Sequence, residues 1–171
     1  ARGDQARKRK PLAPWTRIGG CRAIVAGGPF RRLEPAVVSK AYDVIVVGAR
    51  CAGSPTAMLL ARKGYRVLLV DRATFPSDTI STHLVHPLGV AALSRWGLLG
   101  RLIATGCPLI HTYSFDFGRF AIAGAPGTSE APVAYGPRRT ILDKLLVDAA
   151  AEAGAEVREG FSVEEVLIED G

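Results

Sequence analysis

Two glycines and an acid in this chain have the spacing that a dinucleotide site requires. Gly48 and Gly53 stand five positions apart directly after an apolar run, and Asp71 follows Gly53 by 18 positions. Glycine permits a tight turn and a close approach of backbone to phosphate, and a carboxylate about 20 residues further on can accept hydrogen bonds from ribose hydroxyls. The spacing predicts that main-chain amides between Gly48 and Ser54 hold a diphosphate while Asp71 binds a sugar.

The loop departs from the usual G-x-G-x-x-G pattern at its middle glycine, where Arg50 stands. That glycine is the place where the backbone passes nearest a diphosphate. We therefore expect Arg50 either to shift the loop slightly or to point its guanidinium toward solvent or phosphate. Cys51 follows at the predicted start of a helix, where a thiolate would be favoured.

The elements around this loop indicate a βαβ unit. The run from Asp43 to Val47 is short and β-branched, which is typical of a strand buried in a parallel sheet. A helix is expected to begin near Pro55 and to end at Gly64, and residues 66–70 form a second apolar strand. The order predicts an α/β fold with a Rossmann-like core for FAD or NAD(P) and a parallel sheet. A plain βαβ unit with a tight turn would explain Gly64 but not the small residues between 48 and 57.

Further elements follow toward the end of the chain. Helices are expected over residues 87–96, 98–105 and 140–153, and strands over 155–158 and 161–168. The apolar face of the helix over 140–153 consists of Leu142, Leu145, Leu146, Ala149, Ala150 and Ala153. Asp143 is expected outside that face, where it would form a capping pair with Thr140.

The middle of the chain leaves alternatives open. Tyr113, Phe115 and Phe117 alternate along an expected strand, and their common face lines either a substrate cavity or, as is more usual, the core. The polar segment from Ser81 through Thr82 to His83 either faces cofactor or substrate, or forms a turn that caps the helix begun at residue 87. No metal site is expected from His83 and the nearby His86, because no third ligand is spaced near them.

From Tyr42 to its end the chain resembles the N-terminal part of FAD-dependent oxidoreductases, the group of aromatic-ring hydroxylases, flavin halogenases and geranylgeranyl reductases. The residues that carry the resemblance are YDVIVVGARCAGSPTAMLLARKGYRVLLVDRATFPSDTISTHLVHPLGVAALSRWGLL. It implies that the glycine loop binds the FAD pyrophosphate and that the acid binds the adenosine ribose. The residues in these roles would be Gly48, Ala49, Arg50, Ala52, Gly53, Ser54, Asp71 and Arg72.

The resemblance implies two further cofactor contacts. Arg139, near the start of a helix, would reach phosphate or ribose, and the backbone at Val163 would lie along the adenine. Without the resemblance, Arg138 and Arg139 would be interpreted as solvated surface charges. Family members more often carry glutamate where Asp71 stands. NAD(P)H would be the electron donor, for either oxygen-dependent hydroxylation or reduction of a double bond in a small-molecule substrate. No residue has a clear acid, base or nucleophile role, so the catalytic residues stay unknown.

Relatives of this kind are roughly twice as long or more, and we expect the chain to stop before the second half of the flavin domain. It should then bind FAD weakly or not at all and show no turnover alone. Two other functions remain open. A dehydrogenase could hold NAD in the same loop, and a non-catalytic nucleotide-binding fragment could use a basic leader to contact nucleic acid.

The charge of the chain is divided unevenly. Residues 1–40 carry ten Lys or Arg and two acids, net +8, whereas residues 41–171 carry twelve and fourteen, net −2. We expect residues 1–40 to be a largely disordered leader: a transit peptide, a nucleic-acid tail, or sequence upstream of a gene that begins near Val38 to Tyr42. Residues 41–171 are expected to form the incomplete FAD-binding domain, without affinity for nucleic acid. Three dispersed cysteines and the absence of a long apolar segment predict a cytoplasmic protein with no transmembrane segment.

Overall fold

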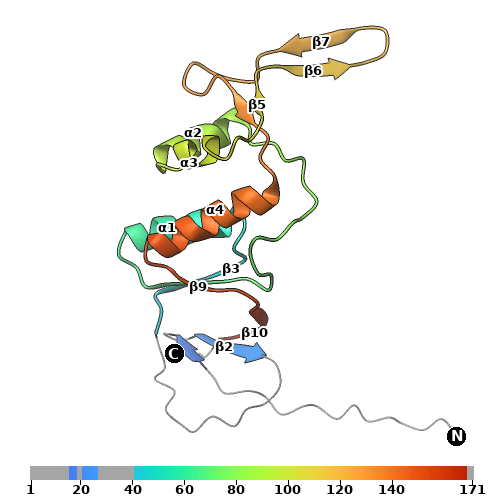
Figure 1. The fold of residues 1–171 in the computed structure, drawn as a ribbon. Helices are drawn as coiled ribbons and strands as arrows, with labels where there is room; N and C mark the ends of the chain where they lie inside the picture. The colour runs from blue at the N-terminus through green and yellow to red at the C-terminus, as the bar shows by residue number, and fades with distance from the viewer. Residues whose placement is uncertain (1–15, 19–20, 27–40, 169–171) are drawn as a thin grey trace, which may run out of the picture.

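The protein is a layered α/β structure built on a parallel sheet. The computed structural model describes residues 16–18, 21–26 and 41–168 (Figure 1). The parallel sheet has the order β3-β4-β9, with β3 at Val44–Val47, β4 at Val67–Val70 and β9 at Glu156–Arg158. The residues of β4 are buried throughout, as expected for a central apolar strand with a neighbour on each side.

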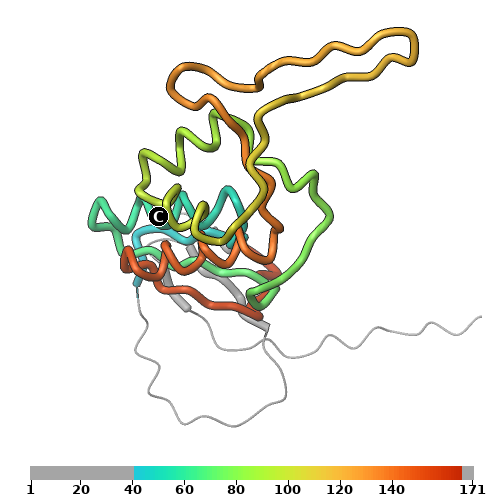
Figure 2. The backbone as a smooth tube through the Cα atoms, turned by 45° about the horizontal axis from the view of Figure 1, so that its top comes forward, coloured from blue at the N-terminus to red at the C-terminus, as the bar shows by residue number. Residues whose placement is uncertain are grey.

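Two long helices cover one face of this sheet. The crossover from β3 to β4 contains α1 (Gly53–Arg62), and α4 (Arg139–Glu152) leads into β9. The two helices lie side by side over the sheet in both views (Figures 1 and 2), and their buried residues share one core cluster. Two shorter helices, α2 (Pro87–Arg95) and α3 (Leu99–Ile103), add a further layer above α4. The helices predicted from apolar spacing are thus present, with ends that differ by one to a few residues.

The other face of the parallel sheet holds a smaller core. Tyr42, Leu68 and Val70 are buried there and pack against Phe161 and Val163. The last two residues flank the start of β10 (Ser162–Ile168), which pairs antiparallel with β2 (Cys21–Ala26). Val163 is thereby held beside the end of β4, close to Asp71.

Part of the leader forms strands that its sequence did not predict. β1 (Thr16–Ile18) pairs with β2, and β2 pairs with β10, so these two short segments belong to a sheet, while the expectation that residues 1–40 are largely disordered stays a prediction. The pairing partner lies about 140 positions away along the chain, which local periodicity cannot reveal. The rest of residues 1–40 lies outside the described residues, and the domain boundary near residue 41 stays a prediction.

A hairpin extends from the helical layers. β6 (Tyr113–Asp116) pairs with β7 (Ala121–Gly124), and both views show it projecting from the body (Figures 1 and 2). Two shorter strands at its base, β5 (Leu109–Ile110) and β8 (Ala134–Tyr135), pair with each other. Phe115 and Phe117 are 61% and 59% exposed, so the prediction of a core face is wrong in the described structure. Strand alternation sets which side chains share a face, but not whether another layer covers it.

Candidate functional site

The loop between β3 and α1 is shaped by its two glycines. Gly48 has φ +101°, a left-handed conformation that side chains disfavour, and its amide donates to the carbonyl of Val70 at 2.7 Å. A Cβ on Gly53 would lie 1.7 Å from the carbonyl oxygen of Gly48. A side chain is therefore disfavoured at Gly48 by the backbone angle and excluded at Gly53 by the close contact with the carbonyl of Gly48.

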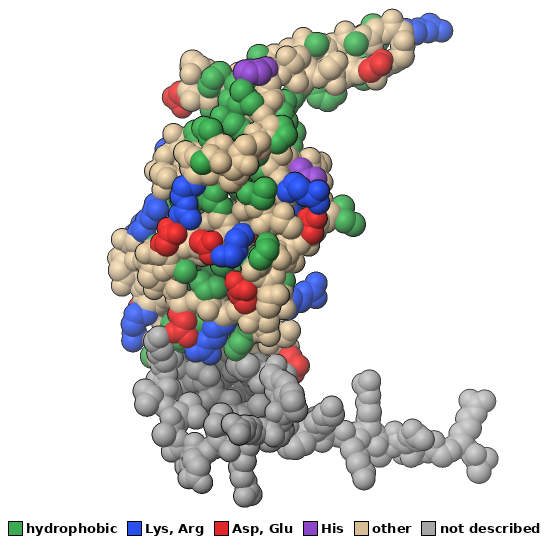
Figure 3. All heavy atoms as spheres, viewed as in Figure 1, with side chains coloured by type: hydrophobic (Ala, Val, Ile, Leu, Met, Phe, Trp, Pro, Cys, Tyr) green, Lys and Arg blue, Asp and Glu red, His purple; other side chains and the backbone are tan. Residues whose placement is uncertain are grey.

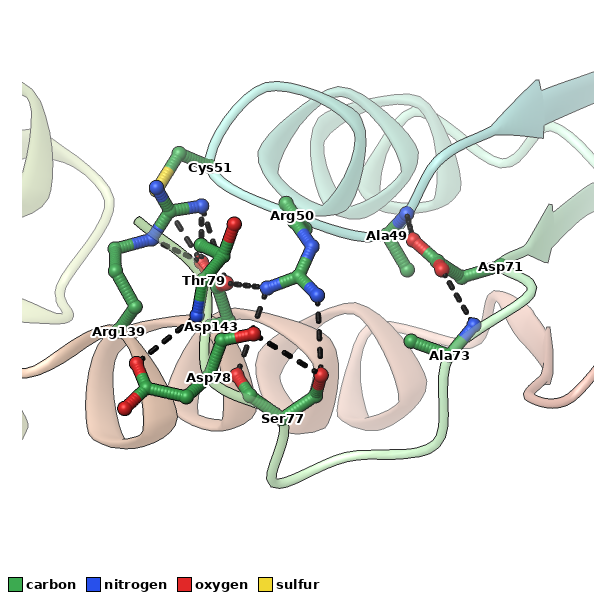
Figure 4. A network of polar contacts seen from close by, with 10 residues as sticks. All are labelled: Ala49, Arg50, Cys51, Asp71, Ala73, Ser77, Asp78, Thr79, Arg139 and Asp143. Atoms are coloured by element: carbon green, nitrogen blue, oxygen red, sulfur yellow. Dashed lines mark hydrogen bonds and ion pairs between the residues drawn. The ribbon is translucent and has the colours of Figure 1, made fainter. Parts of the chain in front are cut away.

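Asp71 joins this loop to the end of β4. Its side chain is buried, and its Oδ2 accepts a hydrogen bond from the amide of Ala49 at 2.7 Å while Oδ1 accepts one from the amide of Ala73 at 2.8 Å (Figure 4). A carboxylate has about four acceptor sites, so both oxygens keep room for a further donor such as a sugar hydroxyl. The acid first predicted as a ribose ligand is also the support of the loop.

A hollow of about 460 Å³ opens at the carboxyl ends of β3 and β4. We call it the strand-edge hollow. Its lining consists of Val47, Gly48, Arg50, Asp71, Arg72, Ala73, Thr79, Phe161, Ser162 and Val163. The strand-edge hollow therefore brings together half of the predicted cofactor residues. They come from the loop, from the end of β4 and from β10. Ligands of open α/β sheets bind at this edge, which supports the predicted diphosphate and ribose contacts.

Arg50 points at a carboxylate, which was not among its expected partners. Its Nη1 donates to Oδ2 of Asp143 at 2.7 Å, and its Nη2 donates to Oγ of Ser77 at 3.1 Å (Figure 4). The guanidinium carbon also lies 5.4 Å from the ring centroid of Phe75. The side chain is thus tied to α4 and to the segment that follows β4, and it is 30% exposed.

Asp143 is fully buried, so its predicted place outside the apolar face of α4 is wrong. Arg139 donates to it from Nε at 3.0 Å and from Nη2 at 3.1 Å, and Cys51 donates from Sγ at 3.3 Å. The predicted cap with Thr140 is wrong as well, because the N-cap of α4 is Arg138 and no side chain bonds to the helix start. The i,i+4 spacing of Arg139 and Asp143 was the signal that could have revealed their pairing.

The thiol of Cys51 is held in its neutral form. Desolvation by the surrounding chain, then the negative charge of Asp143, raises the pKa of Cys51 to about 11. The prediction of a favoured thiolate at the helix start is therefore wrong. Desolvation is the larger cause of the raised pKa, and the carboxylate of Asp143, in contact with the thiol, adds to it.

Arg139 lines a different hollow, of about 420 Å³, between α2 and α4. We call it the helix hollow. Its lining is mostly apolar and consists of Cys51, Ser81, His83, Leu84, Val85, His86, Gly89, Ala92, Leu93, Trp96, Pro137, Arg139, Leu142 and Leu146. The Arg50 and Arg139 side chains, both bonded to Asp143, thus lie at two separate hollows. The predicted contact of Arg139 with phosphate or ribose stays a prediction.

The segment before α2 does not cap that helix through Ser81, Thr82 or His83. The N-cap of α2 is His86, with no side-chain cap, and the Nδ1 of His86 lies 3.0 Å from the hydroxyl oxygen of Tyr113. His83 has φ +52°, and its buried Nδ1 has no hydrogen-bond partner among the described residues. Ser81 accepts a hydrogen bond from the amide of His83, so this segment forms its own turn at the rim of the helix hollow.

The remaining predicted residues, Ala49, Ala52, Gly53 and Ser54, line neither hollow. Ala49 and Ser54 are fully buried behind the loop, and the hydroxyl of Ser54 has no hydrogen-bond partner among the described residues. At the start of α1 the amide of Ser54 donates to the carbonyl of Arg50 at 3.0 Å, and the amide of Thr56 donates to the carbonyl of Ala52 at 3.2 Å.

The sequence of this α/β unit matches the model of a known protein family. The model of the FAD binding domain matches residues 41–171. The chain belongs to the FAD-binding domain family. The resemblance predicted from the glycine loop and its acid is confirmed, and so is the α/β fold class with its parallel sheet.

Relatives of this FAD-binding domain carry several activities. Menaquinone reductase of Mycolicibacterium smegmatis is 36% identical over 124 residues, which cover 72% of this chain and 30% of that protein. The 6-methylpretetramide 4-monooxygenase of Streptomyces rimosus is 33% identical over 103 residues, covering 60% and 18%. The solved structure of the myxobacterial chondrochloren halogenase, an FAD-dependent enzyme, has a TM-score of 0.62 at 26% identity, covering 70% and 28%. The chain spans less than a third of the length of each.

The residues present in this FAD-binding domain fit its cofactor. The two glycines let backbone pack directly on backbone at the start of α1, and the hydroxyl of the fully buried Ser54 there has no hydrogen-bond partner among the described residues. Asp71 adds acceptor sites for a sugar at the rim of the strand-edge hollow. No helix among the described residues has the length and apolar character needed to span a bilayer.

Proposed function

We propose that this FAD-binding domain is the cofactor-holding part of a flavin-dependent oxidoreductase that takes electrons from NAD(P)H. One observation carries the proposal: Gly48, Asp71 and Val163 line a single hollow at the carboxyl ends of parallel strands. The diphosphate lies against the loop that begins at Gly48, the ribose hydroxyls donate to Asp71, and adenine lies along the backbone at Val163. Arg72 flanks the ribose.

Bound FAD supplies the capacity to accept a hydride and to pass the electrons on. In one reaction, NAD(P)H gives a hydride and solvent gives a proton, and both end on the two carbons of a substrate double bond. In the other, one oxygen atom of O₂ enters the substrate and the second leaves as water, with NAD(P)H as the two-electron donor and solvent as the source of one proton. The reductase and monooxygenase relatives support these two reactions.

The substrate of the whole protein is proposed to be a small molecule, and its location the cytoplasm. Cys51 and Cys107 are free thiols, as in a reducing compartment. Charges of both signs are interspersed on the face shown in Figure 3, which supports the expectation that the folded part has no affinity for nucleic acid.

Flavin content tests the proposal. The protein should be purified at the full length of its gene, denatured, and its supernatant examined for the absorbance and fluorescence of FAD. Release of FAD supports a flavoenzyme, whereas a colourless protein that retains NAD would favour the dehydrogenase alternative. Oxygen consumption during NAD(P)H oxidation then separates the reactions, because only hydroxylation uses O₂ in proportion to product. We expect the 171-residue chain alone to retain FAD weakly and to show no turnover.

A further inference from the structure

Arg50 stands where the usual loop pattern has a glycine that brings backbone close to a diphosphate. A Cβ at this position holds the chain back, so that backbone contact is weakened. Arg50 is nevertheless one of the residues that line the strand-edge hollow, together with Gly48 and Asp71. Its side-chain cation is therefore attached at the same loop position where the missing glycine would have offered an amide.

The guanidinium keeps donors for a ligand. Nη1 is used by Asp143 and by the carbonyl of Ser77, and Nη2 donates once, to Oγ of Ser77. Because a guanidinium has five N–H groups, the Nε hydrogen and one Nη2 hydrogen have no partner among the described residues. Arg50 can therefore bind phosphate oxygens without giving up its present contacts.

Asp143 determines where this guanidinium lies. One buried carboxylate receives hydrogen bonds from Arg50 and from Arg139, which leaves a net charge of +1 in the cluster. Two guanidiniums at this distance repel each other without the carboxylate between them, so its loss would let both arms move away. Figure 4 shows Asp143 between the two arginines, with Ser77 on the other side of Arg50.

We infer that Arg50 makes through its side chain the diphosphate contact that a middle glycine would make through its backbone, and that Asp143 is the positioning residue for Arg50. The inference rests on the proposed function, since the diphosphate is that of the dinucleotide. The alternative is that the ion pair between Arg50 and Asp143 serves only to hold the loop against α4. That junction already has an apolar support, because Ala57, Met58 and Leu146 belong to one buried cluster.

Calorimetric titration of the full-length protein, freed of flavin, with ADP and with adenosine tests the role of Arg50, at about 0.3 M salt so that through-space charge effects are screened. Arg50→Ala removes the guanidinium but keeps a Cβ, so it does not restore the backbone contact of a middle glycine. We expect its Kd for ADP to rise about tenfold or more, with adenosine within about twofold. Arg50→Lys should recover part of the loss. As a control, Arg101→Ala removes an arginine paired with Glu152 elsewhere on the surface and should change neither affinity.

Asp143→Ala tests the positioning role. It should weaken ADP binding but not adenosine binding, and the double variant with Arg50→Ala should bind ADP as Arg50→Ala alone does. Additive losses, or tighter ADP binding by Asp143→Ala, would overturn the positioning role. If Asp143→Ala does not fold, the Arg50 variants still decide the inference. Equal losses for both probes, or unchanged ADP binding in Arg50→Ala, would reject it, whereas a full-length wild-type protein that binds neither probe contradicts the proposed function itself.

Discussion

The amide of Ala49 donates a 2.7 Å hydrogen bond to the carboxylate of Asp71, 22 positions later in the chain. The bond joins the end of β3 to the end of β4 at the edge where both strands stop. The same carboxylate receives the amide of Ala73. Asp71 therefore supports the glycine loop, and it is also proposed to bind the same dinucleotide as that loop. Replacing Asp71 should thus lower both the stability of the fold and its affinity for the nucleotide.

Asp71→Ala should lower the free energy of unfolding by about 2 to 4 kcal/mol, because two backbone amides lose their acceptor at a buried place. Urea unfolding followed by circular dichroism measures the change. Asp116→Ala is the matched control: its carboxylate accepts the amide of Gly118 at 2.8 Å, but in an exposed hairpin turn where water can replace it. The control should lose less than about 1 kcal/mol. Equal losses would contradict the supporting role of Asp71.

Gly53→Ala should destabilise the fold by about 2 kcal/mol or more, since the added Cβ would lie 1.7 Å from the carbonyl oxygen of Gly48. The loop must then open, and ADP binding should fall with it. Gly100→Ala is the comparison, because a Cβ there meets nothing within 4 Å and α3 should gain about 0.5 to 1 kcal/mol. Thermal unfolding of both variants measures the difference, and a stable Gly53→Ala protein that binds ADP normally would refute the close contact.

Stability should depend on pH through Asp43. Hydrogen bonds from the side chain and then the backbone of Arg66 lower the pKa of Asp43 from 3.8 to about 2. Because the folded state favours the carboxylate, its contribution is complete above the ordinary value of 3.8 and is lost as the pH falls toward 2. Asp43→Asn should therefore melt below the wild type at pH 6, with a difference that shrinks between pH 4 and pH 2. Arg66→Ala should show the same convergence, and a difference independent of pH would exclude this pair as its source.

Cys51 should alkylate slowly at neutral pH. Desolvation and the charge of Asp143 raise its pKa to about 11, so the reactive thiolate is scarce near pH 8. Peptide mapping after iodoacetamide treatment should show a rate at Cys51 that rises about tenfold per pH unit up to pH 10. A rate that levels off near pH 8 would indicate a thiol without this perturbation. Cys51→Ser confirms that the modified peptide is assigned correctly.

Local pattern was enough for the elements and for much of the site. The β-branched run before Gly48, the small residues after it and the apolar repeat of α4 each depend on neighbours within a few positions, so their periodicity predicts strand and helix directly. The glycine and acid spacing identified the family because a βαβ unit has a nearly constant length between its turn and the end of its second strand.

The tertiary structure decided which charged side chains pair with one another and which apolar faces are buried. Asp143 looks like a solvent-facing residue of an amphipathic helix, and only the approach of the loop at Arg50, 93 positions earlier, makes it a buried counterion. The aromatic face at Phe115 is exposed because no described layer packs on it. Sequence alone determined the helices, the glycine loop and the strands of the parallel sheet, but not the strands β1 and β2 of the leader. The partners of Arg50, Asp143 and Cys51 follow from contacts between distant segments, which local spacing does not encode.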